Sequence, residues 1–195
     1  MTPKSKYRLF IGTYAVVLLS VSLMFSDCSG KREREMPVLP DAVYALSSDT
    51  LPFRFEVSGQ AVFSAKRNRA DEYFCNIHYP GLNACIYCTW HGMHPGDFDT
   101  MARESRALVY SHVQVATGID EQPYADEARR VYGILYDIKG PVATPLQLAL
   151  TDSTSYFFNA SLYFNATPNV DSIAPYLAYI RKDVERMMQT FTPCR

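Results

Sequence analysis

Cysteine and histidine residues gather in the middle of the chain at spacings suited to metal binding. A C-x2-H pattern is followed by C-x2-C-x2-H-x2-H, formed by Cys75 and His78, then Cys85, Cys88, His91 and His94. Thiolate sulfur and imidazole nitrogen are the usual ligands of tetrahedral zinc, and short spacings between them are typical of zinc sites. These residue types and spacings therefore suggest a zinc site or a thiol redox centre.

The strands expected to carry these side chains argue against a shared metal ion. Residues 72–78 and 84–90 have the pattern of two strands, and Pro80-Gly81 with Asn83 predicts the turn between them. Cys85 and Cys88 are an odd number of positions apart, so on a strand they point to opposite faces and cannot bind one ion. The motif also lacks the helix start that lowers the pKa of a catalytic thiol. Metal binding is therefore the weakest interpretation.

Disulfide bonds and buried thiols remain open for the same cysteines. Outside the cytoplasm, Cys75, Cys85, Cys88 and Cys194 are candidates for disulfides, and three pairings of four cysteines exist. Cys194, at the end of the expected last helix, is placed to link that end of the chain to the sheet. The spacing does not choose between a disulfide and inert buried thiols.

The remaining cysteine, Cys28, stands at the end of a predicted export signal. Lys4, Lys6 and Arg8 precede an uncharged apolar stretch at residues 9–25, the arrangement of a secretory signal. A cysteine at the expected cleavage point predicts a lipoprotein with Cys28 acylated, although Asp27 stands where a small residue is usual. An uncleaved anchor or a signal cleaved at another position is the alternative, but as a helix about 17 residues span only roughly 26 Å, short for an anchor.

Sequence signatures of catalysis are not found beside these cysteines. The chain has no G-x-S-x-G, no H-E-x-x-H and no glycine-rich phosphate-binding loop. Asp137, Asp152, Glu121 and Asp126 are candidates for a general acid–base pair, but most lie at expected strand ends or turns, where carboxylates are common. We therefore predict no enzyme, no catalytic residue and no cofactor.

Composition and patterning predict one α+β domain behind a tether. The formal net charge of −1 gives no reason to expect nucleic acid, and fourteen tyrosines and eleven phenylalanines favour a β-rich body. Residues 1–27 are expected to be the signal peptide, 28–50 a lipid-anchored tether that is charged and contains prolines, and 51–195 the domain.

The order of elements predicts an antiparallel sheet flanked by helices. Strands are expected at 53–57, 72–78 and 84–90, then a helix from about 97 to 109, then a meander of three strands between 130 and 165. The last helix is clearest, because its apolar residues recur every three or four positions: Ile173, Leu177, Ile180, Val184, Met187 and Phe191. This long C-terminal helix should pack on the sheet, as in the Mog1/PsbP-like arrangement that the pattern resembles.

Several stretches of the C-terminal half resemble the gliding-motility lipoprotein GldD family. They are Glu121-Gln122-Pro123-Tyr124, Val131-Tyr132-Gly133-Ile134-Leu135-Tyr136-Asp137-Ile138, Leu150-Thr151-Asp152-Ser153-Thr154, residues 160–165, residues 168–175 and residues 179–183. The resemblance covers about residues 100–191, with a weaker counterpart at 51–56. Residues 29–50 and the number of cysteines depart from the family's pattern, which supports a local, non-catalytic role for the cysteines.

The resemblance implies an envelope lipoprotein that serves gliding motility and type IX protein secretion. It implies a membrane attachment through lipid on Cys28, a body facing the periplasm, and other gliding or secretion proteins of the envelope as partners. No catalytic residue is carried over. A ligand-binding lipoprotein of the envelope is the alternative, and it predicts a closed apolar pocket with convergent polar groups.

Overall fold

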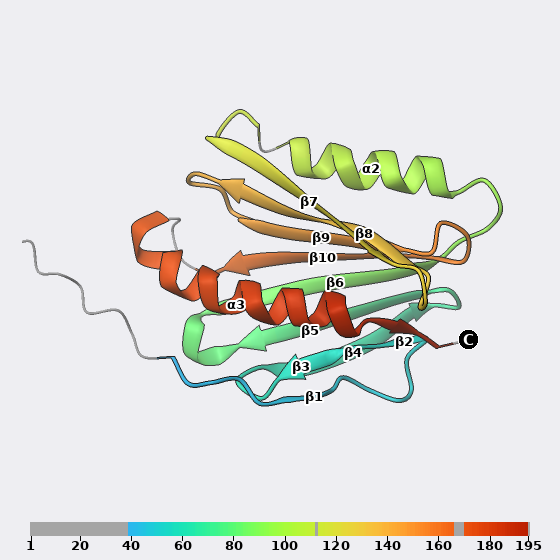
Figure 1. The fold of residues 1–195 in the computed structure, drawn as a ribbon, viewed down its shortest axis with the longest axis horizontal. Coiled ribbons are helices and arrows are strands. Elements are labelled where there is room, and N and C mark those ends of the chain that lie inside the picture. Colours follow the sequence, from blue (N-terminus) through green and yellow to red (C-terminus); the bar gives the residue numbers. More distant parts are fainter. Residues whose placement is uncertain (1–38, 112, 166–169, 195) are drawn as a thin grey trace, which may run out of the picture. The chain divides into compact units, whose positions relative to one another are not determined.

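A seven-stranded antiparallel sheet forms the centre of the computed structural model, which describes residues 39–111, 113–165 and 170–194. Its strands lie in the order β4 (Val62–Arg69), β5 (Glu72–Tyr79), β6 (Ala84–Gly92), β10 (Tyr156–Phe164), β9 (Leu146–Thr151), β8 (Val131–Lys139) and β7 (Gly118–Asp126). Most neighbours in this order are consecutive hairpins, and the pairing of β6 with β10 joins the two halves (Figure 1).

The two halves of the sheet are built from hairpins whose turns use the expected residues. Between β5 and β6, the 3-10 turn η1 (Pro80–Leu82) ends at Asn83, which adopts a left-handed backbone with φ of 50°. Strands β9 and β10 are joined by a turn in which Asp152 accepts hydrogen bonds from the backbone amides of Thr154 and Ser155. The chain crosses from the first half to the second through α2 (Phe98–Tyr110).

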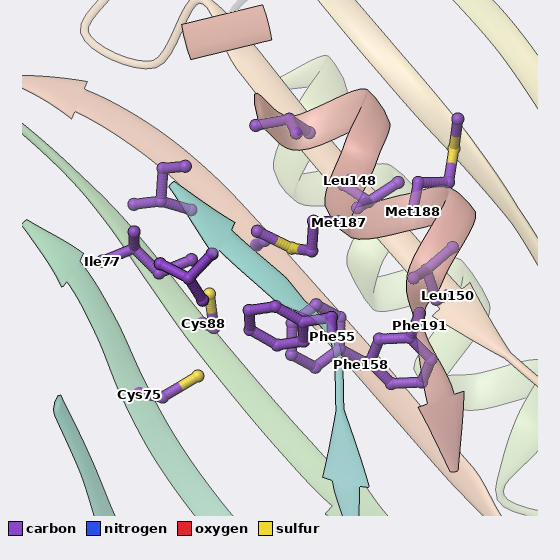
Figure 2. Packing of buried hydrophobic residues seen from close by; sticks show 14 of the residues in the cluster. Phe55, Cys75, Ile77, Cys88, Leu148, Leu150, Phe158, Met187, Met188 and Phe191 are labelled. Atoms are coloured by element: carbon purple, nitrogen blue, oxygen red, sulfur yellow. The ribbon is translucent and has the colours of Figure 1, made fainter. Parts of the chain in front are cut away.

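One face of the sheet is covered by α3 (Val170–Thr190) and by four short strands. β1 (Tyr44–Leu46) pairs with β3 (Glu56–Ser58), and β2 (Phe53–Arg54) pairs with β11 (Thr192–Pro193). Phe191 directly follows α3 and lies at the centre of this layer, with its ring 4.9 Å from that of Phe158 and 5.9 Å from that of Phe53. Figure 2 shows Phe55, Phe158 and Phe191 together between the sheet and the helix.

The other face of the sheet is covered by α2 over a smaller area. Val109 of α2 is buried against Tyr136, Ile138 and Val142 in a separate small core. Alternation along β8 explains the separation, because Leu135 faces the α3 layer while its neighbours Tyr136 and Ile134 face α2. At the edge of α2, the Ser105 hydroxyl donates to the amide oxygen of Asn159 at 2.7 Å.

The predicted α+β class is confirmed, including the long C-terminal helix on the sheet. The predicted stripe of that helix is buried at Ile180, Val184, Met187 and Phe191, whereas Ile173 and Leu177 near its start stay partly exposed. The strands expected at 72–78, 84–90 and in the meander are present, each with slightly different ends.

Three local expectations are corrected by the structure. Residues 53–57 do not form one strand: β2 and β3 are separate and pair with different partners. Strands β4 and β7 were not expected, because their residues are largely polar and exposed at the two edges of the sheet. Residues 44–46, placed in the tether, form β1, so the end of that segment belongs to the folded body.

Candidate functional site

The cysteines of the central motif lie on two neighbouring strands. Cys75 on β5 and Cys88 on β6 are directly opposite each other in the register, and both are buried in the core beneath α3. Figure 2 shows their sulfur atoms on the same side of the sheet. Burial, with a hydrogen bond that the Cys88 thiol donates to Cys75, raises the pKa of the Cys88 thiol well above its ordinary value. A thiol in this environment stays protonated and is a poor nucleophile and metal ligand.

Cys85 points to the opposite face from Cys88, as predicted from their spacing. Its register partner is His78, and its buried thiol has a raised pKa because of desolvation, which hydrogen bonds with Tyr87 and the Ile77 backbone only partly offset. The motif therefore divides between the two faces of the sheet.

The histidines of the motif make separate local contacts instead of meeting at one point. His91 lies 3.5 Å from a carboxylate oxygen of Glu72, while His94 lies 3.5 Å from Asp97 at the start of α2. Within residues 39–111, 113–165 and 170–194, no group of three or more histidine, cysteine and acidic side chains has the arrangement of a metal site.

The four described cysteines are present as free thiols. Cys75, Cys85 and Cys88 are buried free thiols, and Cys194 is an exposed free thiol that follows β11. Cys194 is nevertheless fixed in place, because its backbone amide donates to the carbonyl oxygen of Pro52 at 2.8 Å. The chain end is thus attached by backbone pairing, and a disulfide at Cys194 stays a prediction.

The four carboxylates considered for acid–base chemistry each have a structural partner. Asp137 forms an ion pair with Arg181 of α3, Asp126 with Arg129 at 2.7 Å, and Glu121 with Arg106 at 3.1 Å. Asp152 holds its turn; burial raises its pKa, but hydrogen bonds from the Ser155 hydroxyl and nearby amides outweigh burial and lower the pKa overall. These carboxylates act as ion-pair and turn residues.

A buried carboxylate that the sequence reasoning missed links the first strand to the last helix. Asp183 of α3 is 5% exposed and accepts hydrogen bonds from the Tyr44 hydroxyl at 2.6 Å and the Tyr79 hydroxyl at 3.0 Å. Burial raises the pKa of Asp183, and the hydroxyl donors offset only part of this effect. An acidic residue three positions after Ile180, beside the apolar stripe, was the available signal. We call Tyr44, Tyr79 and Asp183 the tyrosine–aspartate cluster.

The family of the chain is decided by a match that spans the folded body. The family model described as gliding motility lipoprotein GldD matches residues 31–192. The chain belongs to the GldD family. No curated protein matches the chain.

Membership in the GldD family makes the chain a gliding-motility lipoprotein of the cell envelope. Cys28, the predicted lipidation site, lies outside the described residues and before the matched range, so its acylation stays a prediction. Among the helices of the described residues, none is both long and apolar enough to cross a membrane.

Three surface hollows among the described residues of this GldD-family body are open grooves. One of about 340 Å³ lies between α2 and the sheet, beside Tyr87, Glu104, Asn159 and Tyr163. Another of about 330 Å³ lies at the start of α3, and a third of about 270 Å³ lies near Arg129 and Cys194. Beneath α3, aromatic rings fill the space between the helix and the sheet.

Proposed function

We propose that this GldD-family lipoprotein is a non-enzymatic accessory or scaffold component for gliding motility and type IX protein secretion. The observation that carries the proposal is the family match, which extends from before β1 to the first residue of β11 and therefore includes nearly the whole folded body. Lipid on Cys28 would hold this body at a membrane, facing the periplasm, where its surface contacts other envelope proteins of the same machinery.

The chemistry of the described residues supports a binding role over a catalytic one. The three central cysteines are buried, and the carboxylates that could serve as acids or bases are engaged in ion pairs or turns. A scaffold needs a rigid body with accessible surface, and the filled aromatic core beneath α3 provides the rigidity.

A ligand-binding module is the second candidate, favoured by the groove between α2 and the sheet. Its polar groups include the hydroxyl of Ser105 and the side chain of Asn159, and its aromatic residues are Tyr87 and Tyr163. Binding there would use an open groove, because packed side chains fill the core beneath α3 in the described residues.

Gene deletion tests the proposed role in the source bacterium. Loss of the gene should reduce both the release of type IX cargo and the spreading of colonies, and the wild-type gene should restore both. Unchanged secretion and spreading in the deletion strain would contradict the accessory role. A variant that removes a groove contact, Asn159→Ala, should complement fully under the scaffold proposal and fail under the ligand-binding alternative.

A further inference from the structure

The two outer strands of the sheet differ in how accessible their edges are to another chain. The β7 edge contains Pro123, which lacks the N–H group needed for a regular ladder. Its acidic side chains are also engaged within the molecule: Asp120 with Lys139 at 2.5 Å, Glu121 with Arg106, and Asp126 with Arg129. The β7 edge is therefore interrupted by a proline, and these three acidic side chains are already paired within the molecule.

The β4 edge, in contrast, is long, regular and exposed. All of its eight residues are exposed except Phe63, which is half-buried, and the strand contains no proline. Pairing with β5 is continuous from Val62 to Arg67, and a bulge occurs only beyond Arg67. An edge strand directs alternate N–H and C=O groups outward, so this stretch offers a template for one more strand.

Strand β4 carries more basic side chains than there are acidic side chains paired with them. Lys66 has no hydrogen-bond or ion-pair partner among the described residues. Arg67 donates only to the backbone carbonyl oxygens of Arg69 and Ala70, which carry no charge. Arg69 is 84% exposed and lies 4.0 Å from Glu72, the sole carboxylate paired with this strand in the described residues. The edge therefore combines unpaired backbone groups with an excess of positive charge.

We propose that the β4 edge is a docking site for an extended, acidic segment of a partner protein. The segment adds to the sheet as an eighth strand beside β4, with backbone hydrogen bonds supplying the register and its carboxylates facing Lys66 and Arg69. Because an accessory protein works by binding other proteins, this docking site rests on the proposed function.

The same charges disfavour pairing of the edge with a second copy of itself. Lysine and arginine on an edge strand keep identical edges apart by repulsion, which is a common protection against aggregation. The basic side chains repel another basic strand but attract an acidic one. The same residues therefore disfavour self-association and favour docking of an acidic segment. Complementary charge is thus what selects the acidic segment over a copy of β4.

Peptide binding to the purified full-length lipoprotein in detergent tests the proposal. The probe is a labelled pool of eight-residue peptides in which glutamate alternates with varied threonine, valine or serine, and the comparison pool has lysine in place of glutamate. The glutamate pool should bind saturably and at least about tenfold more tightly than the lysine pool. N-methylation of alternate backbone amides should abolish binding, because the added strand needs its N–H groups.

Charge reversal on the edge provides the decisive variants. Lys66→Glu combined with Arg69→Glu should reverse the preference between the pools, whereas Lys182→Glu, at an exposed position of α3, should leave it unchanged. The proposal would be overturned if the glutamate pool did not bind saturably or if both pools bound equally. It would also be overturned if the preference for the glutamate pool survived the double charge reversal. The assay is independent of secretion and spreading, so the docking site and the accessory role fail or stand separately.

Discussion

Beneath α3 the sheet buries a continuous layer of aromatic and aliphatic side chains, whereas beneath α2 the buried core consists of Val109 and three residues around it. The α3 face holds Phe53, Phe55, Phe158 and Phe191 at or near zero exposure. On the other face, Phe74, Tyr87 and Tyr163 remain at least 37% exposed. The stability of the body therefore depends on the first face, and the second is available for contacts.

Removal of the central aromatic ring of the α3 face should have the largest effect on stability. Phe191→Ala is expected to lower the free energy of unfolding by about 3–5 kcal/mol, because it leaves a cavity among four neighbouring rings. Tyr163→Ala, on the exposed face, is expected to cost about 1 kcal/mol or less. Urea denaturation of both variants measures the difference, and equal losses would contradict the comparison.

Close strand packing on the α3 face should make Gly133 the next most sensitive position. A Cβ atom at Gly133 would collide with the carbonyl oxygen of Ala149 and would come within 2.6 Å of a Leu150 methyl carbon. Gly133→Ala is expected to cost about 3 kcal/mol, since backbone must shift. Gly81→Ala is the control, because a Cβ there meets nothing within 4 Å. Similar melting temperatures for the two variants would show that the sheet relaxes freely.

Loss of one donor to the buried carboxylate should have a smaller effect. Tyr44→Phe removes the 2.6 Å hydrogen bond to Asp183 and is expected to lower stability by about 1–2 kcal/mol. The variant should also speed amide exchange in β1, since Tyr44 is the β1 side chain that bonds to α3. Tyr163→Phe, on the other face, serves as the matched control. Unchanged exchange in β1 would refute the link between this strand and the helix.

The pH dependence of stability should report the same carboxylate with a small, directional effect. The pKa of Asp183 is raised in the folded state by burial, so folded protein binds its proton more tightly than unfolded protein. Between the unfolded pKa of about 3.9 and the raised folded pKa, this group's contribution therefore falls as pH rises. Relative to Asp183→Asn, the wild type should gain stability as the pH is lowered from 7 to 4. An opposite trend would mean that the folded pKa is depressed.

Helices and strands whose apolar residues recur with a clear periodicity were predictable from the sequence. Strands that form only because a neighbouring strand pairs with them were not. The stripe from Ile180 to Phe191 and the alternation in β10 fix a helix and a strand that each bury one side. β7 was missed because Pro123 and its acidic neighbours lower strand propensity, and only pairing along the whole of β8 makes it a strand. β1 was missed because its stability comes from β3 and from the Tyr44 hydrogen bond to Asp183.

For the candidate site residues too, features that depend on local spacing were predictable, and contacts between residues far apart in the sequence were not. The odd spacing of Cys85 and Cys88 correctly placed them on opposite faces, since that rule needs only the strand period. The direct opposition of Cys75 and Cys88 depends on the register of the hairpin. The tyrosine–aspartate cluster joins residues 139 positions apart, and no local pattern encodes such a contact.

Metabolic labelling with palmitate tests the lipid anchor, on which the envelope role depends, most directly. The wild-type protein should incorporate labelled palmitate, Cys28→Ala should incorporate none, and Cys194→Ala should be labelled like the wild type, because Cys194 is an ordinary exposed thiol. The mature wild-type chain should also begin at Cys28 by mass spectrometry. An unlabelled wild type, or a Cys28→Ala variant labelled to the same extent, would contradict the account.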